Sequence, residues 1–241
     1  MRHYNTKNPT PLTPISIPLF EWCGVQVFIK RDDLNHPTIQ GNKWHKLKVN
    51  LQQAHRTGAD TLITFGGAYS NHIAATASAA KEYGFKCIGY IRGDELASQP
   101  NKWSPTLIKA AQNSMQLRFL SRKTYREKDS PAFLQKITTE FSHAYLLPEG
   151  GSNPLAVAGF ASLMNDLETQ QPNWTHIFTA VGTGGTLAGL VKYAKIKPKR
   201  SIQGVAVLKQ ADYLIPQVEQ WIGNQPHVEW TLLKNYHGGG Y

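Results

Sequence analysis

A glycine-rich segment between an apolar run and a helix-forming run could bind an anion. The segment Val181-Gly182-Thr183-Gly184-Gly185-Thr186 follows the apolar stretch 176–181 and opens the helix-forming stretch 186–194. Glycines let consecutive backbone N–H groups turn toward one point, and the amino end of a helix adds positive potential. The segment lacks the Gly-Lys-Ser/Thr of a P-loop and the full spacing of a dinucleotide fingerprint. It predicts a phosphate site, although a tight strand-to-helix turn would have the same sequence.

A lysine at the start of a predicted helix could form a Schiff base with an aldehyde. Lys43 lies in the run Gln40-Gly41-Asn42-Lys43-Trp44-His45-Lys46-Leu47-Lys48 and opens a helix predicted over 43–57. The helix dipole disfavours a cation at this end, which lowers the pKa of the amine and favours its neutral, nucleophilic form. Taken alone, a surface helix with several lysines is the simpler interpretation, because few lysines are catalytic.

A third segment places a hydroxyl, an amide and an imidazole where a strand leads into a helix. It reads Phe65-Gly66-Gly67-Ala68-Tyr69-Ser70-Asn71-His72. Ser70 or Asn71 could simply cap the following helix. Alternatively, Asn71 would donate a hydrogen bond to a ligand oxygen, and Ser70 would act as a catalytic hydroxyl. His72 lies inside the helix, where packing or hydrogen bonding is at least as good an interpretation as catalysis.

Strands and helices alternate along the chain and must position these segments. Predicted strands cover 25–29, 61–65, 87–91, 116–120, 144–147, 176–181 and 202–207, and predicted helices cover 43–57, 71–83, 102–113, 131–141, 154–168, 186–194 and 213–222. This order predicts an α/β fold of mainly parallel sheets with helices on both faces. Ligands bind beyond the carboxyl ends of such strands, where the loops 66–71, 149–153 and 182–186 lie.

Composition restricts the class of protein. With 241 residues, 41% of them hydrophobic and 17% charged, the chain can bury a sizeable core. The formal net charge is +10, but the basic residues are scattered and no known motif accompanies them, so we expect no nucleic-acid partner. Because no apolar stretch reaches the length of a signal-peptide core or a membrane span, we expect a cytoplasmic protein that does not bind membranes. Cys23 and Cys87 are expected to be reduced core thiols, and no metal site is predicted.

Five motifs, in order along the chain, resemble one enzyme family. They are Lys30-Arg31-Asp32-Asp33-Leu34, Gly41-Asn42-Lys43, Gly67-Ala68-Tyr69-Ser70-Asn71-His72, Glu149-Gly150-Gly151-Ser152-Asn153-Pro154 and Gly182-Thr183-Gly184-Gly185-Thr186. Together they are similar to the 1-aminocyclopropane-1-carboxylate deaminase / D-cysteine desulfhydrase family, which has the tryptophan-synthase-β-like fold (fold type II of pyridoxal-phosphate enzymes). The resemblance runs through essentially the whole chain and is far more specific than any one motif.

The resemblance implies pyridoxal 5'-phosphate as the cofactor. Lys43 would carry the cofactor's aldehyde, Asn71 would donate a hydrogen bond to its phenolic oxygen, and its phosphate would be held by Gly182, Thr183, Gly184, Gly185 and Thr186. Ser70 would bind the substrate carboxylate or aid proton transfer. Asn71, His72 and Tyr241 are also expected to contact the substrate.

The implied activity is that of a lyase or deaminase acting on a small amino acid. D-cysteine would give pyruvate, ammonia and sulfide, and 1-aminocyclopropane-1-carboxylate would give 2-oxobutanoate and ammonia. His72 after Ser-Asn resembles the desulfhydrase branch, whereas the deaminase typically has Gln there, so a D-cysteine desulfhydrase-like enzyme is favoured. Relatives continue for several dozen residues past Tyr241 and there supply the contact to the pyridine nitrogen. A shortened cofactor-binding homologue without turnover is therefore a further alternative.

The resemblance also implies a domain arrangement and an oligomeric state. A large pyridoxal-phosphate-binding domain, incomplete at its C-terminus, would consist of residues 1–43 and 153–241. A small α/β domain, residues 44–152, would be inserted within it, as insertion at surface loops permits. Relatives are homodimers, so a homodimer is expected here.

Overall fold

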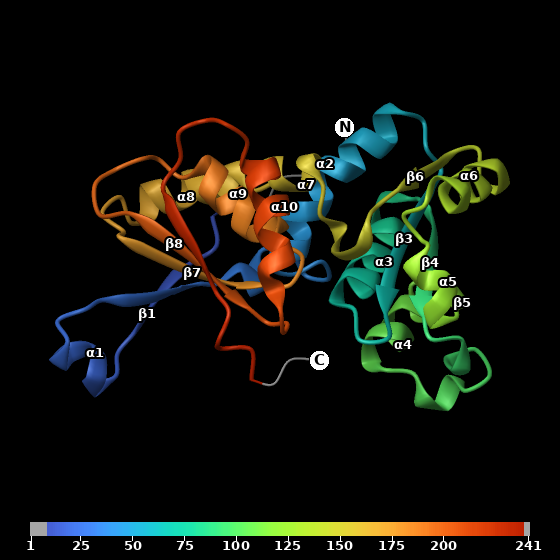
Figure 1. Cartoon of the computed structure of the whole chain (residues 1–241), viewed down its shortest axis with the longest axis horizontal. Helices are drawn as coiled ribbons and strands as arrows, with labels where there is room; N and C mark the ends of the chain where they lie inside the picture. Colours follow the sequence, from blue (N-terminus) through green and yellow to red (C-terminus); the bar gives the residue numbers. More distant parts are fainter. Residues whose placement is uncertain (1–8, 239–241) are drawn as a thin grey trace.

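Three sheets carry the strands of the protein. The computed structural model describes residues 9–238 (Figure 1). A parallel four-stranded sheet has the order β5-β4-β3-β6, a parallel three-stranded sheet has the order β7-β8-β9, and β1 pairs antiparallel with β2. The predicted α/β class with mainly parallel sheets is confirmed. The strands are β1 Leu12–Ile15, β2 Val27–Lys30, β3 Thr61–Gly67, β4 Lys86–Arg92, β5 Gln116–Leu120, β6 Ala144–Leu146, β7 His176–Val181, β8 Ser201–Ala206 and β9 Glu229–Leu233.

Helices connect these strands, and their starts follow ordinary capping chemistry. Ser70, Ser104, Ser121, Ser130 and Asn153 each precede a helix and accept a hydrogen bond from the backbone N–H three residues on. Proline occupies the first turn in three of these five helices, where its missing N–H costs nothing. The helices are α1 Pro18–Trp22, α2 Asn42–Arg56, α3 Asn71–Tyr83, α4 Pro105–Gln112, α5 Arg122–Arg126, α6 Pro131–Glu140, α7 Pro154–Ala158, α8 Ala161–Gln170, α9 Gly185–Tyr193 and α10 Leu214–Ile222.

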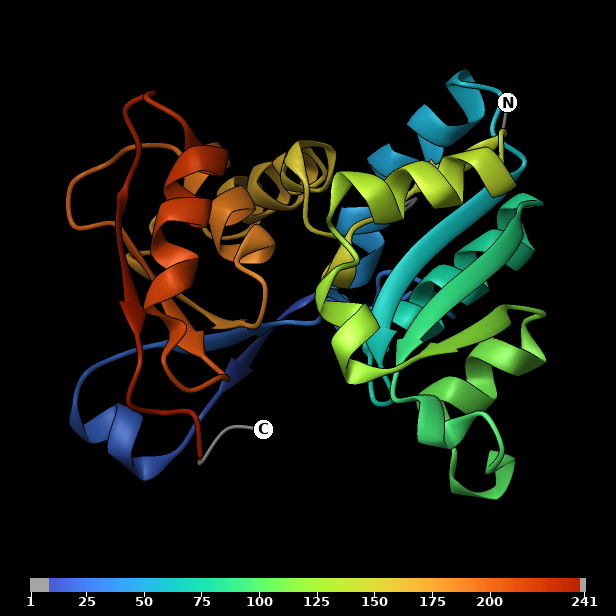
Figure 2. The ribbon, with the colours of Figure 1, turned by 45° about the vertical axis from the view of Figure 1, so that its right-hand side comes forward.

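The four-stranded sheet has a hydrophobic cluster on each face because its side chains alternate along the strands. Leu62 and Cys87 point into the cluster formed with α2, α3 and α4, whereas Ile63 and Ile88 point into the cluster formed with α5 and α6. The two layers of helices enclose the sheet, as the sequence predicted. Figure 2 shows α5 on the side of this sheet that faces the three-stranded sheet.

The three-stranded sheet builds a separate core. Val181, Ile202 and Leu232, one from each strand, pack in a single cluster with residues of α8, α9 and α10. Phe178 in β7 is 65% exposed, so one face of this sheet is not covered by helices. Within residues 9–238, the prediction of helices on both faces is therefore confirmed for the four-stranded sheet alone. Figure 1 shows α2 and α7 between the two sheets. The domain boundaries at 43/44 and 152/153 stay a prediction.

A single helix predicted over 154–168 is wrong, because the structure has two. α7 ends at Ala158 and α8 begins at Ala161, and Gly159 between them lies against α2. A Cβ atom on Gly159 would lie 1.9 Å from the His45 carbonyl oxygen, so only glycine permits this approach. The elements β1, α1, α5 and β9 were not predicted.

The expectation of a buried cysteine is confirmed for Cys87 and is wrong for Cys23. Cys87 is buried in β4, and this burial raises the pKa of its thiol. Cys23 is exposed because it follows α1, a five-residue helix without a buried side chain. Within the part of the chain that the structure describes, none of the helices is long and apolar enough to cross a membrane.

Candidate active site

The glycine loop forms a sharp turn at the carboxyl end of β7. Gly184 precedes α9 with φ +78°, a left-handed conformation that favours glycine. A Cβ atom on Gly185 would lie 2.6 Å from the Ser152 hydroxyl oxygen, so this position also excludes a side chain. At Gly182, by contrast, a Cβ atom would meet only Val207, at 3.9 Å. The absent side chain of Gly182 therefore leaves open space beside the backbone.

Lys43 lies in the first turn of α2, as the sequence predicted. Burial lowers the pKa of Lys43 to about 8. The sequence prediction attributed a lowered pKa to the helix dipole, whereas desolvation is the cause that the structure identifies. At pH 7 to 8 a substantial fraction of the Lys43 side chain is therefore the neutral amine that can attack an aldehyde.

One small cavity brings Lys43 and the glycine loop together. Its volume is about 100 Å³, and its walls come from the start of α2 and from the turn between β7 and α9. The Asn42 side-chain amide donates a hydrogen bond to the Thr186 hydroxyl across 3.0 Å, which fastens the two segments to each other. The lining residues are Asn42, Lys43, Lys46, Ala180, Val181, Gly182, Thr183, Gly184, Thr186 and Leu187. Gly185 faces Ser152 instead.

Lys46 is a second buried lysine in this cavity that sequence reasoning missed. The residue is 2% exposed, and its ammonium donates hydrogen bonds to Gly150 O at 3.1 Å, Ser152 Oγ at 2.8 Å and Thr183 Oγ1 at 3.2 Å. Burial, and then the nearby charge of Lys43, hold the pKa of Lys46 well below its usual value. Among residues 9–238, no carboxylate forms an ion pair with it.

The loop after β6 locks onto the glycine loop. The hydroxyls of Ser152 and Thr183 lie 2.6 Å apart and share a hydrogen bond. A Cβ atom on Gly150 would lie 2.7 Å from the Thr183 methyl group, and Gly150 has φ +68°. The glycines of Glu149-Gly150-Gly151 are thus required by close approach and by backbone conformation. The motif also positions Lys46, a lining residue of the cavity, because Gly150 O and Ser152 Oγ accept hydrogen bonds from its amino group.

Ser70 and Asn71 lie at the start of α3, on the four-stranded sheet. Ser70 caps the helix, with its hydroxyl accepting a hydrogen bond from Ile73 N at 3.3 Å, as one sequence interpretation predicted. Asn71 is exposed, and neither residue lines the cavity around Lys43. Their roles toward cofactor and substrate stay predictions. Tyr241 lies outside the described residues.

His72 is buried beneath the loop after β6. Its Nε2 lies 2.9 Å from Thr64 Oγ1, and its ring would clash with any side chain at Gly151, where a Cβ atom would lie 2.6 Å from Cε1. Burial, and then the charges of Lys43 and Lys46, lower the pKa of His72, so the imidazole is neutral. This agrees with the packing and hydrogen-bonding interpretation, and a contact of His72 with substrate stays a prediction.

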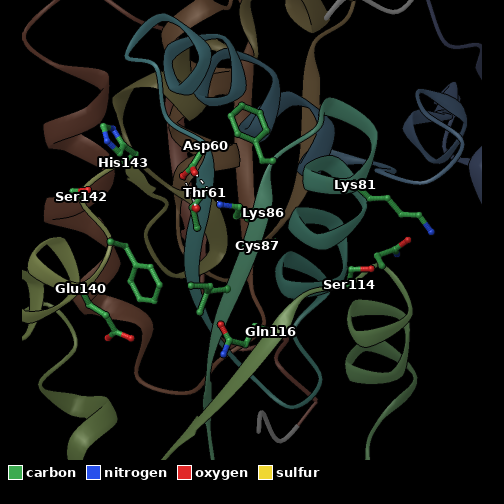
Figure 3. Close-up of a pocket in the computed structure, with 14 residues that line it drawn as sticks. Asp60, Thr61, Lys81, Lys86, Cys87, Ser114, Gln116, Glu140, Ser142 and His143 are labelled. Carbon is green, nitrogen blue, oxygen red and sulfur yellow. Dashed lines mark hydrogen bonds and ion pairs between the residues drawn. The ribbon is translucent and has the colours of Figure 1, made fainter.

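A larger cavity, of about 610 Å³, opens at the opposite edge of the four-stranded sheet (Figure 3). Its lining includes Thr61, Lys86 and Gln116, the first residues of β3, β4 and β5. Asp60 forms an ion pair with Lys86 across this opening, at 3.1 Å. Because ligands of parallel α/β sheets bind at the carboxyl ends of the strands, the smaller cavity around Lys43 is the candidate active site.

The chemistry of the smaller cavity fits a phosphate-bearing aldehyde. Its lining contains two lysines and no carboxylate. A buried ammonium without an acidic partner is costly, and an incoming phosphate would supply the missing charge. The start of α9 and the open space beside Gly182 provide N–H groups and room for such an anion. Lys43 supplies the nucleophile for the aldehyde.

Comparison with known proteins points to the same chemistry. A family model described as pyridoxal-phosphate dependent enzyme matches residues 5–230. A Thermotoga maritima protein assigned as a 1-aminocyclopropane-1-carboxylate deaminase is 30% identical over 97% of this chain and 77% of its own length. A D-cysteine desulfhydrase of Klebsiella pneumoniae is 30% identical over 97% of this chain and 74% of its own length.

Solved structures agree in fold. The crystal structure of a homologue of 1-aminocyclopropane-1-carboxylate deaminase superposes with a TM-score of 0.77 at 28% identity, covering 98% of this chain and 74% of that one. Serine racemase from Dictyostelium discoideum has a TM-score of 0.61 at 20% identity and covers 83% of this chain, which shows a shared fold. The chain therefore belongs to the 1-aminocyclopropane-1-carboxylate deaminase / D-cysteine desulfhydrase family of pyridoxal-phosphate-dependent enzymes.

Proposed function

We propose that the protein is a D-cysteine desulfhydrase-like lyase that converts D-cysteine to pyruvate, ammonia and sulfide. The observation that carries the proposal is the cavity of about 100 Å³ in which Lys43, with its pKa of about 8, faces the glycine loop and Lys46. The relatives' names divide between the desulfhydrase and the deaminase. His72 favours the desulfhydrase, because its position after Ser70-Asn71 matches the residue expected of that branch.

The chain's own residues bind, orient and transfer protons in this proposal. The cofactor, when bound, withdraws electrons from the substrate's α-carbon. Lys46 and the backbone N–H groups at the start of α9 would hold its phosphate, and Lys43 would bond to its aldehyde. After the substrate amine displaces it, the Lys43 amine would take up the proton from the α-carbon, a role suited to a base with a pKa of about 8. Ser70, at the amino end of α3, would orient the substrate carboxylate.

Attachment of the cofactor is tested by chemical trapping. The protein is incubated with pyridoxal 5'-phosphate, reduced with borohydride and digested, and the labelled peptide is identified by mass spectrometry. We expect the label on Lys43 and none on any peptide of Lys43→Ala. Lys109→Met, which alters an exposed lysine of α4, is the matched control and should retain the label. A label elsewhere, or none in the wild-type protein, would contradict the proposal.

Turnover is tested by product analysis. Pyruvate and sulfide are measured with D-cysteine, and 2-oxobutanoate is measured with 1-aminocyclopropane-1-carboxylate. The proposal expects the first pair of products at the higher kcat/KM. Release of 2-oxobutanoate alone would identify a deaminase instead. Cofactor attachment without either product would identify a cofactor-binding protein without turnover, the remaining alternative.

One measurement each tests the oligomeric state and the cellular location that the sequence predicts. We propose a homodimer, on the resemblance stated above, and sedimentation of the cofactor-loaded protein measures its mass directly. The expectation of a cytoplasmic protein is tested by fractionation of the source cells. A monomer in sedimentation, or recovery outside the cytoplasmic fraction, would contradict these two expectations.

A further inference from the structure

Arg92 lies at the carboxyl end of β4, beside the loop that carries Ser70. In the sheet register Arg92 is paired with Gly67, the last residue of β3. A Cβ atom on Gly67 would lie 3.5 Å from Nη2 of Arg92, so the guanidinium packs directly against the start of the loop 67–71. This edge of the sheet is the one at which parallel α/β folds bind their ligands.

Arg92 is exposed, and its guanidinium lies beside an aromatic ring rather than an acid. Its Cζ atom lies 5.9 Å from the ring centroid of Tyr125, a residue of α5 that is 3% exposed. Burial, and then the neighbouring Glu149 carboxylate, raise the pKa of Tyr125, so its phenol is neutral. Glu149 directly precedes Gly150, whose carbonyl oxygen accepts a hydrogen bond from Lys46. A continuous set of contacts therefore joins Arg92 to the cavity of the candidate active site.

The positive charge of Arg92 is not neutralised within residues 9–238. Two acids in the neighbourhood have other partners: Glu95 pairs with Arg122 at 2.7 Å, and Glu149 pairs with Lys128 at 3.3 Å. Arg92 itself forms neither an ion pair nor a hydrogen bond to a side chain in this part of the chain. An exposed cation with free donors at a ligand-binding edge can pair with an anion.

We infer that Arg92 binds a negative charge at the side-chain end of the amino-acid substrate and so determines its class. The inference rests on the proposed function, in which Ser70 and the amino end of α3 orient the α-carboxylate. Gly67 lies between this position and Arg92, and a Cβ atom there would meet Nη2 of Arg92 at 3.5 Å, so the guanidinium lies next to this loop. The α-carboxylate would therefore lie toward α3, and the side chain would extend toward the guanidinium.

Such a residue suits the release of sulfide from D-cysteine. The proton of the α-carbon goes to Lys43, the carbon–sulfur bond breaks, and a double bond forms between the α- and β-carbons. The sulfur leaves with its electron pair as hydrosulfide, and the guanidinium stabilises this negative charge while keeping its own protons. The cyclopropane amino acid has no such group, so Arg92 would distinguish the two substrates.

The inference is tested by binding of ligands that have the same shape and differ in charge. Isothermal titration calorimetry on the cofactor-loaded protein compares aspartate with asparagine and glutamate with glutamine, each as both enantiomers. Since hydrogen bonds between charged groups are worth more than those to neutral ones, at least one acid should bind roughly 10- to 100-fold more tightly than its amide. Arg92→Gln should bring that ratio close to one, and Arg92→Lys should retain part of it.

Arg56→Gln is the matched control for this test. Arg56 is an exposed arginine at the far end of α2, roughly 20 Å along the helix from Lys43, and the variant removes the same charge. It should keep the wild-type ratio. Equal affinity of the wild-type protein for acid and amide in both pairs, or an unchanged ratio in Arg92→Gln, would overturn the inference. Failure of the proposed function would be seen separately, as the absence of a reducible bond at Lys43.

The same variants give a catalytic readout. Arg92→Gln should lower kcat/KM for D-cysteine roughly 10- to 100-fold relative to kcat/KM for 1-aminocyclopropane-1-carboxylate, because the cyclopropane amino acid has no anion to lose. Arg92→Lys should restore part of the difference. Equal losses with both substrates would show a structural role and would overturn the assignment.

Discussion

Removing the buried charge of Lys43 should stabilise the cofactor-free protein. Burial lowers the pKa of Lys43 from 10.5 to about 8. One pH unit in a pKa corresponds to about 1.4 kcal/mol, so the folded state is about 3 kcal/mol less stable than it would be with an unperturbed lysine. Methionine keeps an unbranched apolar side chain and carries no charge. Lys43→Met should therefore raise the free energy of unfolding by up to ~3 kcal/mol at pH 7.

The pH dependence of this gain follows from the order of the two pKa values. Below the folded-state value of about 8, Lys43 is protonated in both states, and the cost of burying its charge is present in full. Between about 8 and 10.5 the folded state releases its proton first, so the stability of the wild-type protein rises toward that of the variant. Above the unfolded-state value the two proteins should be equally stable.

Urea unfolding, followed by circular dichroism at pH 7 and near pH 10.5, measures both quantities. Lys109→Met, which removes an exposed lysine, should match the wild-type protein at either pH. The reasoning would be refuted if Lys43→Met were less stable than the wild-type protein at pH 7. A gain of the same size at both pH values would also refute it, because it would come from packing instead of charge.

Four further substitutions and one matched control test the site and the fold. Lys46→Met should weaken binding of pyridoxal 5'-phosphate about 10- to 100-fold in a fluorescence titration, because it removes the buried amino group that would face the phosphate. Gly182→Ala should leave the melting temperature unchanged yet weaken the same binding, since its methyl group enters open space in the cavity. Gly159→Ala should destabilise the fold by about 2 kcal/mol or more in urea, because its methyl group would overlap the carbonyl oxygen of α2. Ser70→Ala and the matched cap variant Ser130→Ala should each cost about 1 kcal/mol of stability, but kcat should fall in Ser70→Ala alone.

The sequence predicted most of the fold because its elements follow simple patterns. β5, β7 and α3 have the predicted limits, and each has clear apolar periodicity or a capping residue. The missed elements lack these signals. In β1 no side chain is fully buried, and α1 and α5 have five residues each, too few for a helical repeat to be recognised. The division of helix 154–168 depends on Gly159 meeting the carbonyl of His45, a contact between distant segments that local patterns do not contain.

The sequence predicts the nucleophile and the glycine loop of the candidate site but not its second buried lysine. Lys43 and the glycine loop were found by residue type and order, and the structure places both in one cavity. The sequence alone predicts Lys46 as one of several surface lysines, although Lys43, Lys46 and Asn50 follow helical spacing along one side of α2. That spacing was a usable signal, and Asn50, 0% exposed, confirms that the polar stripe is buried. What the sequence could not supply was the partner surface that buries it.

The buried polar stripe explains why α2 can carry two neighbouring lysines. The apolar side of the helix, with Trp44 and Leu47, packs in the core of the four-stranded sheet, and its polar side faces the glycine loop and the loop after β6. Burial and the nearby charge of Lys43 lower the affinity of Lys46 for protons, and burial lowers the affinity of Lys43 itself. A phosphate beside Lys46 would raise the pKa of Lys46 again. A covalent bond between Lys43 and an aldehyde would remove the buried charge of the Lys43 amine. The same two events that load the cofactor therefore relieve the destabilisation of the empty site, and loading should stabilise the fold more than its contacts alone would do.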